Sequence, residues 1–393
     1  MNTVKSNGHN TCFDVEKAVR ERYSRGAQKK EKSLCCPVPY KPHFLERIPQ
    51  EILEKDYGCG DPSVYLREGD TVLDLGSGAG KICFIASQVV GHKGRVIGVD
   101  FNSTMLSLAN KYKDEVAEKI GWKNVEFRRG RIQDLKTDLN ALEDYLSKNP
   151  VKNLEDFMEM ENAIRNVQKN HPLIADASVD VIVSNCVLNL VKPEEKKTLF
   201  KEMYRVLKKG GRVAISDIVS DTLVSEELQN DPDLWSGCIS GAFEEKAFLK
   251  AFEDAGFYGI KLEKRDEKPW QIVQGIEFRS VTVVAYKGKE GACWEKNQAV
   301  IYKGPWKEVR DDDQHVLKRG VRTAVCDKTY QIFSKEPYRD NIILVPPRKE
   351  IPLSKAKPFD CSRDLERSPQ ETKGLKYKAN KITNSACMDG ECC

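Results

Sequence analysis

Four short stretches of the sequence place cysteines where a thiol can do chemistry. They are SLCCPVPYKP with Cys35 and Cys36, YGCGDP with Cys59, SNCVLNL with Cys186, and LWSGCISGAF with Cys238. Three of these stretches have a small or polar residue beside the thiol, whereas Cys83 lies inside the apolar pattern KICFIAS, which favours core packing. We therefore expect the thiols of the four stretches to face a cavity. At Cys186 the alternatives are a nucleophile, a ligand for a substrate, or a packing residue.

A glycine-rich loop in LDLGSGAGK indicates a cofactor. Gly76, Gly78 and Gly80 give G-x-G-x-G, but a lysine stands where the dinucleotide fingerprint needs its next glycine. Asp74, at the end of the preceding predicted strand, would repel a pyrophosphate and attract a sulfonium. Asp100 ends the next predicted strand, where a carboxylate can accept both ribose hydroxyls. These residues predict S-adenosylmethionine; a glycine turn that serves only close helix packing is the disfavoured alternative.

The elements around this loop alternate between strand and helix patterns. Strands are predicted at TVLDL, GRVIGVD, NVEFRRGRI, VDVIVSN and GRVAISDIV, with helices between them, so we expect a parallel α/β sheet. GIKLEKRDEK and FRSVTVVAYKG predict two final strands that pair antiparallel at its edge. Because ligands of such sheets bind at the carboxyl ends of the strands, Cys186 is expected beside the cofactor.

Composition excludes several classes of function. The chain has 393 residues, and its net charge of +4 comes without a basic stripe, so no nucleic-acid partner is expected. No apolar run reaches the roughly 18 residues of a membrane span, and the N-terminus lacks a signal-like apolar stretch, so we expect a cytoplasmic protein without a membrane partner. Thirteen cysteines without a secretion signal argue against a disulfide framework, and a monomer is the default.

The motifs together resemble one family. YGCG, LDLGSGAG, VSNCVLNLV, EMYRVLKKGG, SDIVSD and LWSGCISGA, in this order, are similar to the arsenite methyltransferase family, which makes mono- and dimethylated arsenic from trivalent arsenic and S-adenosylmethionine. The glycine loop alone is generic to methyltransferases, whereas the cysteine motifs jointly are specific. Trivalent arsenic is soft and suits thiolate ligands. Three thiolates leave its lone pair free to attack a methyl group, so no general base is required.

The resemblance implies roles for the cysteines. Cys186 and Cys238 would hold arsenic through both trivalent substrates, and Cys59 would supply a third sulfur for inorganic arsenite, whether free or as a glutathione conjugate. Between methylation rounds Cys59 would form a disulfide with Cys36, for which Cys35 can substitute. Thioredoxin or glutathione would then act as the thiol reductant.

The resemblance also implies further cofactor contacts, at Tyr57, Gly58, Ser77, Met105, Ile132, Gln133 and Asn185. Met105 and Ile132 would flank the adenine, although core packing is nearly as good an explanation for each. Gln133 stands where relatives carry glutamate, and its amide oxygen can still accept a hydrogen bond from the adenine amine.

We therefore predict a class I Rossmann-like methyltransferase sheet with appended parts. The expected division is an N-terminal thiol-bearing cap (1–65), an S-adenosylmethionine-binding domain (66–218) with a helical insertion (136–176), an arsenic-binding segment that completes the sheet (219–286), a β-rich C-terminal domain (287–360) and a disordered tail (361–393). The tail cysteines, including Cys361, are expected to be flexible thiols, and Cys12, Cys293 and Cys326 receive no role. The rival functions are a methyltransferase for a small organic acceptor such as a quinone, and a non-catalytic metalloid-binding protein.

Overall fold

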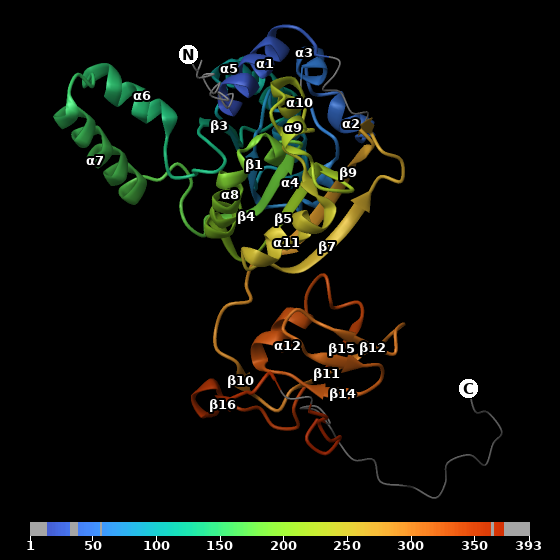
Figure 1. Cartoon of the computed structure of the whole chain (residues 1–393). Helices are drawn as coiled ribbons and strands as arrows, with labels where there is room; N and C mark the ends of the chain where they lie inside the picture. The colour runs from blue at the N-terminus through green and yellow to red at the C-terminus, as the bar shows by residue number, and fades with distance from the viewer. Residues whose placement is uncertain (1–13, 32–37, 56, 363–364, 373–393) are drawn as a thin grey trace, which may run out of the picture. The chain divides into compact units, whose positions relative to one another are not determined.

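The computed structural model in Figure 1 describes residues 14–31, 38–55, 57–362 and 365–372. The chain divides between Gly288 and Lys289 into two compact units. Among the described residues, no helix has the length and apolar character needed to cross a membrane.

A central sheet forms the body of the first unit. Its strands are β1 (Thr71–Leu75), β2 (Arg95–Asp100), β3 (Val125–Arg129), β4 (Val179–Asn185), β5 (Leu207–Ser220), β7 (Tyr258–Arg265) and β9 (Ile276–Tyr286), with short β6 (Phe243–Glu244) and β8 (Gln271–Val273) at its margins. The order is β3-β2-β1-β4-β5-β9-β7. Strands β1 to β5 run parallel, and β9 lies antiparallel between β5 and β7. The predicted Rossmann-like sheet and its antiparallel final pair are confirmed.

Two apolar cores cover the faces of this sheet. The flanking helices are α4 (Lys81–Val90), α5 (Ser103–Ile120), α8 (Pro193–Val206) and α11 (Glu245–Asp254). Side chains alternate along β4, so that Ile182 joins the cluster containing α8 and α11, while Val181 and Val183 join the cluster containing α4 and α5. Burial on both faces explains why the strands are nearly continuously apolar in sequence.

The N-terminal segment, the loop after β4 and the segment after β5 contribute further helices and 3-10 turns outside the sheet. These are α1 (Val15–Gln28), α2 (Pro42–Leu45), α3 (Gln50–Glu54), the 3-10 turns η2 (Pro62–Tyr65) and η3 (Leu188–Leu190), α9 (Glu226–Gln229) and α10 (Pro232–Ser236). Val15 and Val19 of α1 pack with Trp235 of α10. The contact joins two elements that the sequence separates by some two hundred residues.

The insertion between β3 and β4 forms two helices, α6 (Leu139–Lys148) and α7 (Leu154–Asn170), which extend to one side of the sheet (Figure 1). Neither helix contains a buried residue, which agrees with its charged, helix-periodic sequence. The chain leaves and returns at neighbouring points, because the amide of Leu173 donates to the Lys136 carbonyl at 3.0 Å.

The second unit is rich in short strands, as predicted. Its elements are β10 (Trp294–Glu295), β11 (Ala299–Tyr302), β12 (Glu308–Arg310), β13 (Val316–Lys318), β14 (Arg322–Ala324), α12 (Asp327–Phe333), β15 (Ile342–Val345), η4 (Leu353–Lys355) and β16 (Lys357–Pro358). Strand β11 lies between β14 and β15, β12 pairs with β13, and β10 pairs with β16.

The expected disorder from residue 361 is wrong for residues 365–372. The amide of Ala324 donates to the Leu365 carbonyl at 2.8 Å, and the buried Arg367 forms an ion pair with Glu295 at 2.7 Å. A polar composition misled the prediction, because these contacts satisfy polar groups against distant parts of the unit. Residues 373–393, with the remaining tail cysteines, lie outside the described residues.

Candidate active site

Cys186 and Cys238 both adopt backbone conformations that side chains rarely take. Cys186 follows directly after β4 with φ +62°, and Cys238 follows α10 with φ +64°. A non-glycine residue held in a sparsely populated region costs about 1–3 kcal/mol and persists only where the surroundings impose it. Such strain gathers at functional sites, and here it falls on two of the predicted substrate ligands.

Asn185 fixes the turn that carries Cys59. Its Oδ1 accepts hydrogen bonds from the amides of Cys59 at 2.9 Å and Gly60 at 3.0 Å, and its Nδ2 donates to the Gly60 carbonyl at 2.8 Å. A Cβ on Gly58 would lie 2.3 Å from that Nδ2, so the close approach requires glycine there. The structure thus gives Gly58 and Asn185 a positioning role, and their predicted contact with the cofactor stays a prediction.

Cys59 and Cys186 form a disulfide in this structure, with their Cα atoms 5.8 Å apart. The resemblance gave Cys59 a different partner, Cys36, which lies outside the described residues together with Cys35. The Asn185 hydrogen bonds hold the Cys59 turn against the end of β4, where Cys186 follows, and the pairing of Cys59 with Cys36 stays a prediction.

Cys238 completes a group of three cysteines. Its Sγ donates to the Cys186 carbonyl at 3.2 Å, and it lies 4.0 Å from the hydroxyl of Tyr23 on α1. Burial, followed by the influence of Cys238, raises the pKa of Tyr23 well above its usual range, so this phenol is neutral. The structure therefore brings together the three predicted arsenic ligands, although they come from three distant parts of the sequence.

Asp217 is a site residue that sequence reasoning missed. This fully buried carboxylate on β5 accepts hydrogen bonds from the amides of Leu188 at 2.8 Å and Ile218 at 2.8 Å, and from Nδ2 of Asn189 at 2.9 Å. Burial raises its pKa to about 6. Its contacts hold the segment that follows Cys186. A charged residue inside the strand pattern AISDIV was the available signal.

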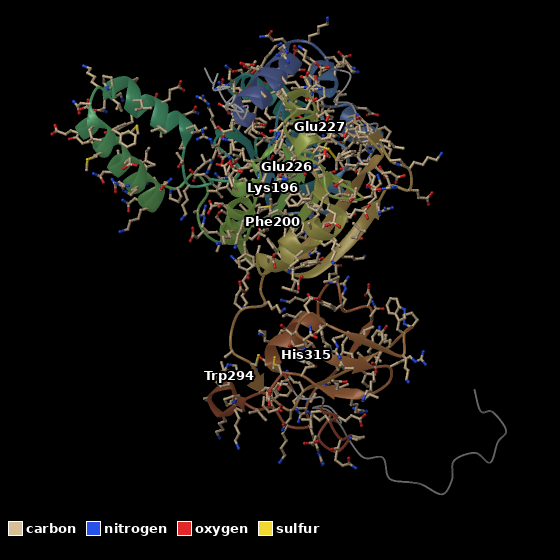
Figure 2. All side chains as sticks on the ribbon, in the orientation of Figure 1. Lys196, Phe200, Glu226, Glu227, Trp294 and His315 are labelled. Atoms are coloured by element: carbon tan, nitrogen blue, oxygen red, sulfur yellow. A yellow bond between two sulfur atoms is a disulfide. The ribbon has the colours of Figure 1, made fainter. Side chains whose placement is uncertain are left out.

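Lys196 connects α8 to the segment after Cys238. Its ammonium donates to the Gly241 carbonyl and lies 4.0 Å from the centre of the Phe243 ring. Figure 2 labels Lys196 and Phe200 on the same helix. Burial lowers the pKa of Lys196 to about 8, while the nearby Asp217 carboxylate opposes this shift. Lys196 therefore holds the backbone after Cys238, and Asp217 holds the backbone after Cys186.

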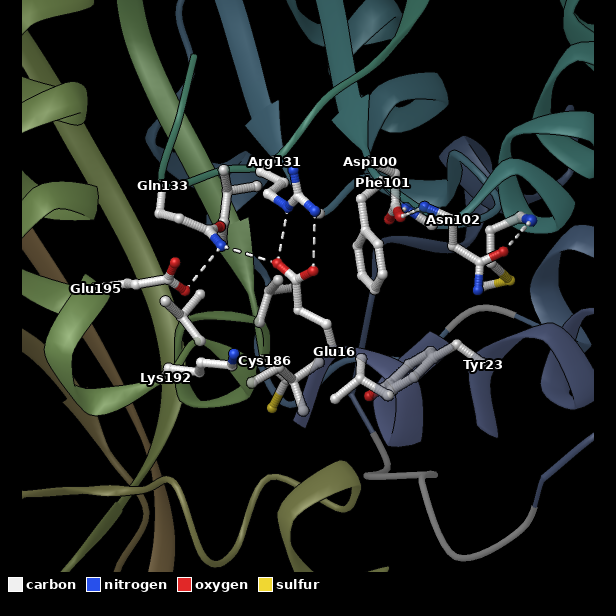
Figure 3. A pocket seen from close by; sticks show the side chains of 18 of the residues that line it. Glu16, Tyr23, Asp100, Phe101, Asn102, Arg131, Gln133, Cys186, Lys192 and Glu195 are labelled. Atoms are coloured by element: carbon white, nitrogen blue, oxygen red, sulfur yellow. Dashed lines mark hydrogen bonds and ion pairs between the residues drawn. The ribbon is translucent and has the colours of Figure 1, made fainter. Parts of the chain in front are cut away.

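A pocket opens at the carboxyl ends of the strands (Figure 3). The predicted residues among those lining it are Tyr57, Gly76, Gly78, Asp100, Met105, Ile132, Gln133 and Cys186. The predicted residues Gly58, Asp74, Ser77 and Asn185 are not among the described residues that line it. Cys186 therefore belongs both to this pocket and to the cysteine group.

The glycine loop fits a cofactor with a ribose. The Asp100 carboxylate accepts from the amides of Gly78 at 2.9 Å and Asn102 at 2.8 Å, which fixes it at the pocket, at the place where the sequence predicts the acceptor for ribose hydroxyls. Gly76 has φ +71°, and a Cβ there would lie 2.3 Å from Val187. The buried Ser77 hydroxyl has no hydrogen-bond partner among the described residues, and its predicted contact with the cofactor stays a prediction.

Asp74 is buried directly below this loop. Its carboxylate accepts a hydrogen bond from the Cys83 thiol at 3.2 Å. Cys83 therefore packs in the core, as predicted, and also donates to the carboxylate that the sequence assigns to a cationic cofactor.

A polar cluster on the pocket wall was also missed. Glu16 of α1 forms an ion pair with Arg131, with contacts of 2.8 and 3.1 Å, and Nε2 of Gln133 donates to Glu195 at 3.1 Å (Figure 3). The amide nitrogen of Gln133 thus faces carboxylates, which leaves its oxygen as the acceptor that the prediction assigns to it. Glu16 and Arg131 are 115 residues apart, so no local pattern could pair them.

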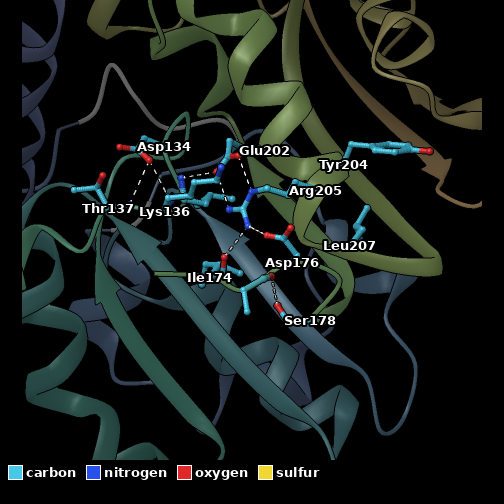
Figure 4. A network of polar contacts seen from close by, with 12 residues as sticks. Asp134, Lys136, Thr137, Ile174, Asp176, Ser178, Glu202, Tyr204, Arg205 and Leu207 are labelled. Atoms are coloured by element: carbon cyan, nitrogen blue, oxygen red, sulfur yellow. Dashed lines mark hydrogen bonds and ion pairs between the residues drawn. The ribbon is translucent and has the colours of Figure 1, made fainter. Parts of the chain in front are cut away.

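The segment that carries Ile132 and Gln133 is anchored to α8. Glu202 accepts from the amide of Leu135 at 3.0 Å, and Arg205 donates to Glu202 at 2.7 Å and to the Ile174 carbonyl at 3.1 Å (Figure 4). These contacts tie both ends of the insertion to α8.

Comparison with known proteins agrees with this geometry. A family model described as a methyltransferase domain matches residues 66–172 and 155–256, and a domain of unknown function matches residues 289–377. The parallel sheet, the glycine loop and the carboxylate at the end of β2 define an S-adenosylmethionine-dependent methyltransferase.

Individual relatives narrow the assignment. The chain is 32% identical over 319 residues to arsenite methyltransferase of Aquipseudomonas alcaligenes, covering 77% of this chain and 81% of that protein. It is 29% identical over 331 residues to the human arsenite methyltransferase, covering 81% and 78%. A crystal structure of an arsenic(III) S-adenosylmethionine methyltransferase from Chlamydomonas reinhardtii matches with a TM-score of 0.53 and 25% identity, covering 83% and 100%. The chain belongs to the arsenite methyltransferase family.

Proposed function

We propose that the chain methylates trivalent arsenic held by Cys59, Cys186 and Cys238, and that it releases mono- and dimethylated arsenicals. The observation that carries this proposal is the convergence of the three cysteines beside a pocket that Cys186 itself lines. Three sulfurs match the pyramidal, soft arsenic centre and need no fourth ligand.

The chain's contribution is to orient the acceptor. When bound, S-adenosylmethionine supplies an electrophilic sulfonium methyl group for the lone pair of thiolate-bound arsenic. Asp100 and the glycine loop would hold this cofactor, while the cysteines fix arsenic at the pocket's end. Because the acceptor atom carries no proton, no residue acts as a general base. Orientation of this kind can supply about 7–11 kcal/mol in favourable systems.

Repeated turnover requires two electrons. Methyl transfer formally oxidises arsenic to the pentavalent state, and two cysteine thiolates can return it to the trivalent state as they become a disulfide. Thioredoxin or glutathione would then reduce that disulfide by thiol exchange. The bond between Cys59 and Cys186 supports this cycle, since it shows two proposed ligands in an oxidised form that must be reduced before arsenic binds. Cys36 is the alternative partner for Cys59.

Arsenic speciation tests the proposal. The purified chain is incubated with arsenite, S-adenosylmethionine and glutathione, and the products are separated by chromatography with mass detection. Methylated arsenic from the wild type and none from Cys186→Ser is the expected result, with Cys12→Ser as a control that removes a thiol without a proposed role. Binding of the cofactor without any methylated arsenic would refute the proposal and favour an organic acceptor.

A second comparison tests how the thiols divide their work. In a single turnover, Cys59→Ser should lose methylation of inorganic arsenite but keep methylation of trivalent monomethylarsenic, which needs only two sulfurs. Cys238→Ser should lose both activities. Equal losses for both substrates in Cys59→Ser would show that Cys59 is not specific to the first round.

A further inference from the structure

Three cysteines of the C-terminal unit converge outside the active site. Cys293 precedes β10, Cys326 precedes α12, and Cys361 follows β16. Their sulfur atoms all lie within 4.8 Å of one another. Figure 2 labels Trp294, the neighbour of Cys293. The cluster contradicts the expectation that Cys361 is a flexible thiol, and it gives Cys293 and Cys326 a shared location.

Backbone pairing holds the three thiols in place. In the β10·β16 pair Trp294 lies opposite Pro358, and the amide of Phe359 donates to the Cys293 carbonyl at 2.8 Å. Cys326 is fully buried, and its Sγ lies 3.2 Å from the Thr329 hydroxyl. Cys293 and Cys361 are only partly buried, so a small solute can reach the cluster from their side.

We propose that Cys293, Cys326 and Cys361 form a second binding site for trivalent arsenic, in the C-terminal unit. Arsenite is neutral As(OH)₃ near pH 7 and condenses with three thiols. Three As–O bonds break, three As–S bonds form, and each thiol proton leaves with a hydroxide as water. Nothing is oxidised or reduced, and no charge is left in the buried site.

The composition of the cluster favours arsenic over zinc. Structural zinc sites are almost always four-coordinate, and within the described residues this cluster offers only three ligands of the His, Cys, Asp or Glu type. Pyramidal trivalent arsenic is satisfied by three sulfurs.

Electrostatics points the same way. Zinc would have to expel protons and would leave a net negative charge among buried groups. Arsenite exchanges with neutral thiols and leaves a neutral complex. The inference goes beyond the proposed function, since it uses none of the active-site cysteines.

The test uses the full chain in a Cys59→Ser, Cys186→Ser, Cys238→Ser background, which removes the proposed active-site ligands. The protein is reduced with a phosphine, titrated with arsenite and examined by native mass spectrometry. One bound arsenic is expected, with a mass gain of one arsenic atom less three hydrogens. Adding Cys326→Ser should weaken binding by more than about 100-fold, because even a residue that only supports a metal ligand is worth about 10- to 100-fold.

Two further variants make the result decisive. Cys361→Ser replaces a partly buried thiol and should also lose the arsenic, which keeps the test valid if Cys326→Ser does not fold. The control variant, Cys387→Ser, Cys392→Ser and Cys393→Ser together, removes three thiols of the same chain region that lie outside the cluster, and it should retain the arsenic. Loss in this control with retention in Cys361→Ser would overturn the proposal. A second result would also overturn the proposal. In it, the protein with the intact cluster carries one zinc ion per chain and binds no arsenic, and Cys361→Ser loses that zinc.

Discussion

At the end of β4, one asparagine side chain organises the strand end and the turn that carries Cys59. Asn185 accepts from two backbone amides and donates to the Gly60 carbonyl and the Tyr40 hydroxyl. A short amide can do this because it carries both donors and acceptors on one rigid plane. The position of Cys59 relative to Cys186 therefore depends on a residue that need not touch arsenic.

Asn185→Ala tests this dependence. The substitution leaves two buried amides unsatisfied, and we expect the free energy of unfolding to fall by about 2–6 kcal/mol, at about 1–3 kcal/mol per unsatisfied group. Displaced thiols should lower the methylation rate by about 10- to 100-fold. Urea unfolding and arsenic speciation measure the two effects. Asn149→Ala, which removes an exposed amide donating to Tyr145, should leave both unchanged; similar losses in both variants would contradict the assigned role.

Asp217 gives the stability of the protein a specific pH dependence. Burial raises its pKa from 3.8 to about 6, so between these values the folded chain keeps a proton that the unfolded chain has lost. The contribution of Asp217 to the unfolding free energy is therefore largest below about pH 4, falls as the pH rises to about 6, and is constant above that. Asp217→Asn should remove this falling slope when unfolding is measured from pH 4 to 7.

Other titrating groups do not obscure the difference in pH dependence between the wild type and Asp217→Asn. The Lys111 ammonium lowers the pKa of Glu51 to about 2, which gives a slope of opposite sign, but this slope is common to both proteins and cancels in their difference. Identical slopes in wild type and Asp217→Asn would show that this carboxyl does not titrate as described. Arsenic methylation by the wild type should decline below about pH 6, because protonation removes an acceptor from the segment after Cys186.

At the scale of elements, α1 links the cofactor pocket to the segment that carries Cys238. Glu16 lies at the pocket wall, whereas Arg22, two turns later, donates to the Asp233 carbonyl and to the Ser236 hydroxyl at 2.9 Å. One helix thus contacts both halves of the proposed active site. This explains why a segment outside the central sheet is needed to build it.

Arg22→Ala should loosen α10 against α1. Hydrogen bonds from a charged donor contribute about 1.5–3 kcal/mol. Their loss should therefore reduce the population in which α10 is packed against α1 by roughly 10- to 100-fold. We expect faster hydrogen exchange in residues 15–28 and 232–242, and slower methylation. Arg25→Ala changes an exposed arginine of the same helix and serves as the control. Unchanged exchange in residues 232–242 of Arg22→Ala would refute the link.

At the scale of the whole molecule, the pocket and the three proposed arsenic ligands lie in the first unit. A chain ending at Gly288 should therefore bind S-adenosylmethionine and methylate arsenite, while it loses the second arsenic site. Isothermal titration with the cofactor and arsenic speciation check both parts. A folded truncated chain that no longer binds the cofactor would show that the second unit contributes to the first.

The sequence by itself determined the order of strands and helices, the antiparallel final pair, the glycine loop and the carboxylate of Asp100. These features are local, because hydrophobic periodicity and turn residues act over a few neighbouring positions. The sequence also marked the active-site cysteines through their small and polar neighbours, and family resemblance supplied their roles.

Only the tertiary structure decided which groups meet. Cys59 and Cys186 are 127 residues apart, Glu16 and Arg131 are 115 apart, and the thiols of the second unit come from three separate segments. Residue type and spacing carry no information about which loops converge once strands pair, since register and packing bring distant segments together. Three features are therefore consequences of the folded chain, where burial gives each polar group or thiol its partners. They are the hydrogen bonds of Asn185 to the Cys59 turn, the buried Asp217, and the cluster of Cys293, Cys326 and Cys361.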